Sequence, residues 1–476
     1  MIPASPHATV VSLPTLADVE GYERKDQKVW QHIQGGYPRF VCNPLVVQAA
    51  ARAAQGLKRT GELFPLASRR AAEKLLAWAG INDATIDVAG DWFLVTTRAG
   101  EGAEKFGKLI QHTGVLISSR QAEAYLANSG SAKTGEGAIA SIQEACAPYF
   151  SGVAQSDILI SLSGMNSVAA AIAAVNAVQA PHGRTLWIQL GWLYVDSARL
   201  FEKAQDTQHE FISDVQNLAV VEKLLAKGNV AAVFTEAPNN PQLETADILK
   251  LRELCDRYGA KLVIDPSSVG ITTLDLLPHA DIVCCSLTKY AASRGDVMAG
   301  LLVVNPARPD AAQLLKVARA QLEPLYHLDA EVLAEQIKRI GEVSQRLSKN
   351  AAEIARRLSS DPAVVKVRTA DTGPTAVNFK ALQRQGAGAG CLITIELKGE
   401  MRAVYDQLDL VKGPSFGVEF TIASPFLWLA HFAEVTSPEG RASVRAAGLD
   451  PDLLRISIGL EPIEEIWAAF EAALKK

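Results

Sequence analysis

The sequence lacks any long apolar run and any block of positive charge. Its 476 residues include 47 Lys plus Arg against 52 Asp plus Glu, which gives a formal net charge of −5. No stretch reaches the roughly 18 uninterrupted apolar residues of a membrane-spanning helix, and no basic cluster could follow a phosphate backbone. We therefore expect no membrane span and no nucleic-acid partner.

The N-terminal sequence also has none of the features of a secretory signal. MIPASPHATVVSLPTLADVE lacks the positively charged start and the apolar stretch that such signals need. We therefore expect a cytoplasmic protein.

Cysteine is scarce, and its spacing forms no recognisable ligand pattern. The sequence has no C-x-x-C among its six cysteines, which are Cys42, Cys146, Cys255, Cys284, Cys285 and Cys391. Paired cysteines at short spacing are typical of structural zinc sites and redox motifs. We predict reduced, mostly buried thiols and no metal site.

The length of the chain predicts more than one domain within a globular subunit. A hydrophobic content of 48% and a charged content of 21% are typical of a soluble globular protein. Composition and pattern divide the chain into an extended, proline-punctuated arm at 1–50, an inserted mixed helical and strand region at 51–155, a large domain at 156–328 and a smaller C-terminal α+β domain at 329–476.

The large domain has the repeating pattern of an α/β fold. Short Val/Ile/Leu-rich runs alternate there with helical stretches, and the runs are ILISL, LWIQL, VAAVFTE, KLVID, DIVCCS and GLLVVN. Nearly continuous apolar strands indicate a buried parallel or mixed sheet with helices on both faces.

The residues that follow these strands could carry chemistry, because ligands of open α/β sheets bind beyond the carboxyl ends of the strands. Ser163, Gly164 and Met165 follow the first run and open an alanine-rich helix, whose free N–H groups suit a phosphate. Later runs end in or are followed by further polar residues, which are Asn240, Asp265, Ser286, Thr288 and Lys289. A lysine, an aspartate and a phosphate cradle are the parts that pyridoxal phosphate (PLP) requires.

Several motifs resemble those of the PLP enzymes of cysteine and methionine metabolism, which include cystathionine gamma-synthase, cystathionine gamma-lyase and methionine gamma-lyase. From the N-terminus onward the motifs are YPR, SGM, EAPNNP, ADIVCCSLTKYAASRGDVMAG and LLRISIGLE, which is the order in which the family has them. The resemblance implies a fold type I large domain with a mostly parallel sheet, similar to aspartate aminotransferase, and a smaller C-terminal domain.

The resemblance also implies roles for individual residues. Lys289 would be the Schiff-base lysine and proton shuttle, and Asp265 would pair with the pyridinium nitrogen. Asn240 would bind the ring hydroxyl, and Tyr194 would stack on the ring and serve as an acid or base. Arg455 would clamp the substrate carboxylate with Ser415 beside it. The phosphate would be bound by Ser163, Gly164, Met165, Ser286 and Thr288, joined by Tyr37 and Arg39 from a partner subunit.

Two reactions of the family stay open. The resemblance favours γ-replacement on an activated homoserine, with C–S bond formation through a vinylglycine-type imine as in trans-sulfuration. The alternative is γ- or β-elimination, which releases an oxoacid and ammonia. A shared active site implies at least a homodimer, and the family implies a homotetramer built as a dimer of dimers.

Two competing classes and two departures from the family pattern also bear on the function. SLTK fits the S-x-x-K of penicillin-binding hydrolases, but S-D-N is absent and KTG lies upstream. A catalytically inactive scaffold of the same fold is the non-enzyme alternative. Val195, Asp196 and Ser197 stand where the family has G-G-T, and an aromatic residue, Phe416, follows Ser415. These residues would line the substrate mouth, which leaves room for an atypical amino-acid substrate. The inserted region at 51–155 could cap the site, build an oligomer contact or simply decorate the fold, and the sequence does not decide between these roles.

Overall fold

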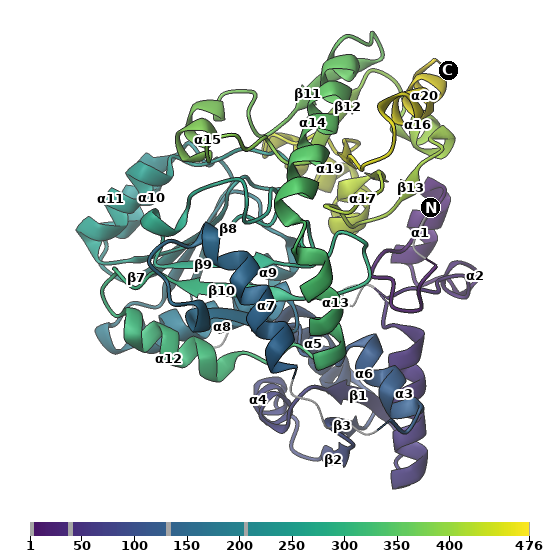
Figure 1. The fold of residues 1–476 in the computed structure, drawn as a ribbon, viewed down its shortest axis with the longest axis vertical. Coiled ribbons are helices and arrows are strands. Elements are labelled where there is room, and N and C mark those ends of the chain that lie inside the picture. The colour runs from purple at the N-terminus through teal and green to yellow at the C-terminus, as the bar shows by residue number, and fades with distance from the viewer. Residues whose placement is uncertain (1–3, 37–40, 130–134, 204–207, 476) are drawn as a thin grey trace.

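The computed structural model describes residues 4–36, 41–129, 135–203 and 208–475. The chain forms a large α/β body, a C-terminal α+β domain above it in Figure 1 and a small lobe below it. No helix of the described ranges is long and apolar enough to cross a membrane.

A seven-stranded sheet forms the centre of the large body. The strand order is β4-β10-β9-β8-β7-β5-β6. Strand β10 is antiparallel to both of its neighbours, and the pairs from β6 through β9 are parallel. The strands are β4 (Ile158–Ser161), β5 (Leu186–Leu190), β6 (Gln208–Ile212), β7 (Val230–Glu236), β8 (Lys261–Asp265), β9 (Ile282–Ser286) and β10 (Gly300–Val304). The predicted mostly parallel α/β sheet is confirmed.

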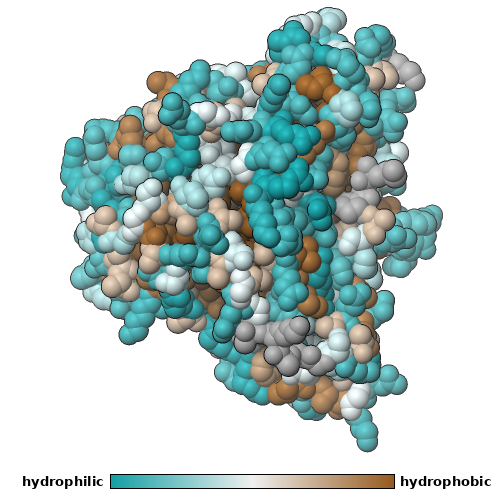
Figure 2. Space-filling view, in the orientation of Figure 1, coloured by the Kyte–Doolittle hydropathy of each residue, from teal (hydrophilic) through white to brown (hydrophobic). Residues whose placement is uncertain are grey.

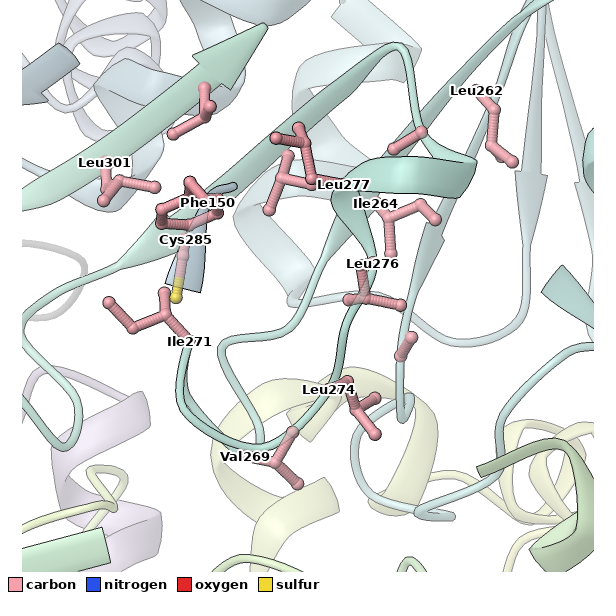
Figure 3. Packing of buried hydrophobic residues seen from close by; sticks show 14 of the residues in the cluster. Phe150, Leu262, Ile264, Val269, Ile271, Leu274, Leu276, Leu277, Cys285 and Leu301 are labelled. Atoms are coloured by element: carbon pink, nitrogen blue, oxygen red, sulfur yellow. The ribbon is translucent and has the colours of Figure 1, made fainter. Parts of the chain in front are cut away.

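Helices cover both faces of this sheet and build two hydrophobic cores. On one face lie α8 (Gly164–Gln179), α9 (Val195–Lys203) and α12 (Ala311–Gln321). On the other lie α7 (Glu136–Cys146), α10 (Leu218–Leu225), α11 (Ile248–Tyr258) and α13 (His327–Ile337). Figure 3 shows part of this second core, where Phe150, Cys285 and Leu301 lie close together. The cores hold the strand ends in fixed positions.

The C-terminal domain is built on a five-stranded sheet of order β11-β12-β15-β14-β13. Its strands are β11 (Val364–Arg368), β12 (Leu392–Leu397), β13 (Val411–Lys412), β14 (Ile422–Ser424) and β15 (Leu454–Ser457). Helices α14 (Ile340–Ser359), α16 (Met401–Gln407) and α20 (Ile463–Leu474) pack against it. The expected α+β architecture is present.

The N-terminal segment packs against the C-terminal domain of its own chain. It carries two short helices, α1 (Leu16–Glu23) and α2 (Gln27–Trp30), which lie beside that domain in Figure 1. The Leu16 N–H donates to Asp406 at 2.7 Å, and the Tyr405 hydroxyl donates to the Leu13 carbonyl at 2.8 Å. The expected reach into a partner subunit stays a prediction.

The inserted region forms the lower lobe of Figure 1. Its antiparallel sheet has the order β1-β3-β2, with β1 (Glu62–Leu66), β2 (Thr85–Ala89) and β3 (Trp92–Thr97). The helices of the lobe are α3 (Pro44–Leu57), α4 (Arg69–Ala79), α5 (Glu101–Thr113) and α6 (Ser119–Leu126). Helix α3 runs through residue 50, and α7 packs in the core of the large body. The helices and strands of the lobe therefore begin before residue 51 and end at Leu126, well before residue 155.

The surface in Figure 2 is mainly hydrophilic over α13 and α14, and its apolar residues form small scattered groups. Exposed large apolar side chains are likewise dispersed, and include Val88, Val365 and Val377 on different elements. Single apolar residues of this kind are normal on a soluble surface.

Candidate active site

A cavity of about 390 Å³ lies at the carboxyl ends of the central strands. The predicted residues that line it are Ser163, Gly164, Met165, Tyr194, Asn240, Asp265, Ser286, Thr288, Lys289 and Arg455. Ser415 reaches the same place through its hydrogen bond to Lys289. Tyr37 and Arg39 lie outside the described residues. The structure thus brings together strand-end residues that are more than 290 positions apart in the sequence.

Lys289 is buried at the end of β9, with 5% of its surface exposed. Its Nζ donates to the Ser415 hydroxyl at 2.8 Å and lies 4.8 Å from the centre of the Phe416 ring. A buried amine of this kind is costly unless it is paired or used chemically. The site therefore suits a lysine that bonds to a ligand.

The backbone beside this lysine depends on a glycine of the C-terminal domain. The N–H of Tyr290, whose φ is 60°, donates to the Gly417 carbonyl at 2.7 Å. Gly417 has a φ of +71°, and a Cβ at this position would lie 2.9 Å from the Tyr290 nitrogen. Only glycine meets both requirements without strain.

Two buried carboxylic acids lie side by side at the ends of β7 and β8. Glu236 and Asp265 are directly opposite in the parallel strand pair. Burial raises the pKa of Asp265 from 3.8 to about 6. Burial and the nearby Asp265 raise the pKa of Glu236 well above its usual value. Two such acids are stable together when a cation lies against them, and a protonated pyridine nitrogen is such a cation.

Hydrogen bonds fix both carboxyl groups. Glu236 accepts the Tyr194 N–H at 2.5 Å. Asp265 accepts the Ser267 N–H at 2.8 Å, and the Ser267 hydroxyl in turn accepts the Ser286 N–H at 2.8 Å. The end of β8 is thereby tied to the end of β9, where the phosphate-binding residues were predicted.

The first turn of α8 has the form of an anion cradle. Ser163 caps the helix, since its hydroxyl accepts the Asn166 N–H at 3.1 Å and donates to the Gly114 carbonyl at 2.8 Å. A Cβ on Gly164 would lie 2.8 Å from the Ser286 Cβ, so glycine allows the helix to approach β9. A helix N-terminus beside a serine hydroxyl suits a phosphate.

Arg455 lies in β15 with its guanidinium fixed on several sides. Nη2 donates to the Pro414 carbonyl at 2.6 Å and to the Ser415 carbonyl at 3.1 Å, and Nη1 donates to Asn240 Oδ1 at 3.4 Å. The guanidinium carbon lies 5.0 Å from the centres of the Phe416 and Phe426 rings. Such a preorganised arginine suits a carboxylate.

The inserted lobe supplies a wall of the cavity, which is one of the roles that the sequence left open for this region. Strand β1 and helix α5 bring mainly apolar residues to it, together with the loop after α5; these are Leu63, Phe64, Pro65, Gly107, Ile110, Gln111, Gly114 and Leu116. Glu236 was also missed, although it opens the EAPNNP motif. Apolar wall residues have no motif, so their only sequence feature is the periodicity of a buried helix face.

The family of the chain follows from a comparison with known proteins. The sequence model of the protein family described as Cys/Met metabolism PLP-dependent enzyme matches residues 152–475. The chain belongs to this family. It is a PLP-dependent enzyme, and bound PLP would accept electrons from bonds at the substrate's Cα. The lysine, the acid pair and the anion cradle fit that cofactor.

Two relatives are similar to the chain over about two thirds of its length or more. The chain is 37% identical to an L-2-amino-4-chloropent-4-enoate dechlorinase/desaturase of Streptantibioticus cattleyicolor, over 99% of this chain and 97% of the relative. It is 32% identical to a cystathionine gamma-synthase of Neurospora crassa, over 67% of this chain and 52% of the relative.

A crystal structure of cystathionine gamma synthase from Xanthomonas oryzae pv. oryzae, in complex with cystathionine, is also similar. It has 26% identity and a TM-score of 0.61, over 70% of this chain and 84% of that chain. The expected fold is thereby confirmed, and PLP-dependent γ-elimination or γ-replacement is supported in general terms.

Among the described residues, no group of three or more His, Cys, Asp or Glu is placed to hold a metal ion. The described cysteines are free thiols, and all except Cys42 are buried.

Proposed function

We propose that this enzyme catalyses γ-elimination from an amino acid with a small, apolar side chain that carries a halide, such as 2-amino-4-chloropent-4-enoate. The observation that carries the proposal is the apolar cavity wall from the inserted lobe. Residues such as Leu63, Ile110 and Leu116 favour a side chain without charge or strong polarity.

The extents of two matches to known proteins support this choice of substrate. The family model begins at residue 152, after the whole of the lobe. The similarity to the dechlorinase/desaturase covers 99% of the chain, so it includes the lobe. A match that extends through the lobe supports a common class of substrate.

Different residues of the cavity would bind the substrate carboxylate, transfer protons and stabilise the charge of the cofactor ring. Arg455 would bind the substrate carboxylate bidentately, which orients Cα toward the amine of Lys289. Lys289 would move protons at Cα and Cβ, and Tyr194 would act near the leaving group. The acid pair of Asp265 and Glu236 would hold the positive charge of the pyridine ring, which PLP needs to act as an electron acceptor.

γ-Replacement on an activated homoserine is the second candidate. The similarity to cystathionine gamma-synthases of two organisms favours it. The same strand-end residues could serve both reactions, because replacement and elimination diverge only after the γ group has left.

A panel of substrates separates the two candidates. The purified holoenzyme is given 2-amino-4-chloropent-4-enoate, cystathionine or methionine, and O-acetyl- or O-succinylhomoserine with and without cysteine. We expect chloride release from the first compound at a kcat/KM at least about 10-fold above oxoacid or thioether formation from the others. Thioether formation as the dominant activity would favour replacement, and no turnover of any compound would contradict both.

We also propose a cytoplasmic homodimer, or a dimer of dimers, in which Tyr37 and Arg39 of one subunit complete the phosphate site of the other. Mixing Arg39→Ala subunits with Lys289→Ala subunits tests this arrangement. Activity should reappear in the mixed dimers, since half of their sites would contain both native residues. No recovery after subunit exchange, shown by mass measurement of mixed dimers, would contradict the shared site.

A further inference from the structure

Asp196 is a buried carboxylate in the wall of the cavity, with 2% of its surface exposed. It lies in the first turn of α9, two residues after Tyr194. The next residue, Ser197, donates its hydroxyl to the Met165 sulfur at 3.6 Å. The turn that carries Asp196 therefore lies against the anion cradle at the start of α8.

The inserted lobe supplies the partners of this carboxylate. Gln111 of α5 donates from Nε2 to Asp196 Oδ1 at 2.9 Å, and His112 Nδ1 lies 3.1 Å from the same oxygen. His112 is buried as well and does not line the cavity. Gln111 and His112 therefore both hold Asp196 Oδ1, and these two contacts fix the orientation of the carboxylate in the cavity wall.

We propose that Asp196 is a catalytic residue that exchanges a proton with the outermost carbon of the substrate's side chain, and that His112 is a positioning residue for it. This inference rests on the proposed function. Lys289 acts where the substrate joins the cofactor, at C2 and C3. Asp196 lines the same cavity, held by residues of the lobe that shapes the side-chain pocket, and would serve C5.

The chemistry balances without an added oxidant or reductant. In 2-amino-4-chloropent-4-enoate the C4–Cl bond breaks, and chloride leaves with the electron pair. One hydrogen leaves C5 as a proton to the Asp196 carboxylate, and the pair from the C5–H bond becomes a new π bond between C4 and C5. Protons that Lys289 removes from C2 and C3 return to these carbons. The net change is the loss of HCl.

An analogue without a leaving group isolates the proton transfers. L-2-aminopent-4-enoate is incubated in D₂O with the holoenzyme, and NMR follows deuterium uptake at C2, C3 and C5. Deprotonation at C3 delocalises electrons to C5, so deuterium enters at C5 when an acid lies there. We expect the wild type to exchange all three positions.

The variants distinguish a catalytic from a structural role. In Asp196→Asn, the rate of deuterium exchange at C5 should fall by at least about 100-fold, while the exchange rates at C2 and C3 stay within about 3-fold of the wild-type rates. His112→Asn should slow C5 by roughly 10-fold with C3 unchanged. Asp91→Asn is the matched control, because Asp91 also belongs to the lobe and accepts from Gln121 at 3.3 Å outside the cavity. It should change nothing.

Two further measurements separate a loss of catalysis from a loss of folding or of cofactor binding. The thermal midpoint and visible spectrum of each holoenzyme show whether the fold and the cofactor are retained. If Asp196→Asn fails to fold, two results still test the proposal. These are whether the wild type exchanges deuterium at C5 and whether His112→Asn slows that exchange without slowing exchange at C3.

Unchanged C5 exchange in Asp196→Asn, an equal loss at all three positions, or wild-type exchange confined to C2 and C3 would overturn the proposal. No exchange at C2 in the wild type would instead refute the proposed function, and this inference with it.

Discussion

Lys289 and Ser415 are joined by a 2.8 Å hydrogen bond from the lysine amine to the serine hydroxyl. The lysine follows β9 of the large body, and the serine belongs to the C-terminal domain. The amine is therefore positioned by both domains, and the Phe416 ring, 4.8 Å away, covers it. The order of the motifs in the sequence predicted the lysine but not this contact.

Replacing Lys289 by alanine should abolish the yellow absorbance of the lysine-bound cofactor and reduce turnover by at least about 10⁴-fold, because no other lysine of the described residues lines the cavity. Absorbance spectroscopy and turnover of the substrate panel measure both effects. Lys261→Met is the control, since Lys261 is also buried but pairs with Asp310 at 2.8 Å. This variant should be less stable and still yellow.

Asp265→Asn should stabilise the apoprotein near pH 7 by on the order of 2 kcal/mol, because the fold raises the pKa of this acid from 3.8 to about 6. Well below pH 3.8 the acid is protonated in both the folded and unfolded states. As the pH rises to about 6 the unfolded chain ionises first, so wild-type stability falls while the variant is unaffected.

Urea unfolding of both apoproteins between pH 4 and pH 7 checks the prediction for Asp265. The holoenzyme should respond in the opposite direction, since the variant loses the carboxylate that holds the pyridinium and should bind PLP more weakly. An apoprotein stability difference that does not depend on pH would contradict this interpretation.

Apoprotein stability should respond differently to two substitutions of Glu236, the acid beside Asp265. Burial and Asp265 raise the pKa of Glu236 well above its usual value, so the folded apoprotein favours the protonated acid. The neutral analogue Glu236→Gln keeps the acceptor oxygen and should therefore leave apoprotein stability near pH 7 unchanged or higher. Glu236→Ala leaves the Tyr194 N–H without its acceptor and should cost about 2–4 kcal/mol. Thermal and urea unfolding measure the two values, and equal costs would argue against a protonated Glu236.

The central sheet was predictable because its strands are buried on both faces and read as continuous apolar runs. The edge strand β6 was not predicted, since its sequence QHEFI is mostly polar and partly exposed. The helical pattern DAEVLAEQIKRIGEVSQRLSKNAAEIARRLSS at 329–360 predicts one long helix. The chain instead forms α13 and α14 with a break at Lys338 and Arg339. A continuous amphipathic pattern does not reveal where packing changes direction.

The site was predictable where chemistry restricts the residue type. A Schiff base needs a lysine, and a close approach of helix and strand needs a glycine such as Gly164. The acid pair required knowledge that β7 and β8 are neighbours, and the link from His112 to Asp196 required knowledge that α5 packs against α9. Tertiary neighbours of this kind follow from the fold rather than from any local pattern.

The cavity wall predicts a change in substrate preference when one apolar residue becomes polar. Leu63 lies in β1 and faces the cavity, so Leu63→Gln places an amide where the proposed substrate has an apolar side chain. We expect kcat/KM for 2-amino-4-chloropent-4-enoate to fall about 10-fold or more, mainly through KM, because apolar contact contributes to binding. The spectrum of the cofactor should not change, since Leu63 belongs to the lobe. Leu57→Gln is the matched control, because this leucine is exposed at the end of α3, outside the cavity. If both variants keep the wild-type preference, the lobe does not select the side chain, and γ-replacement becomes the better account of the enzyme.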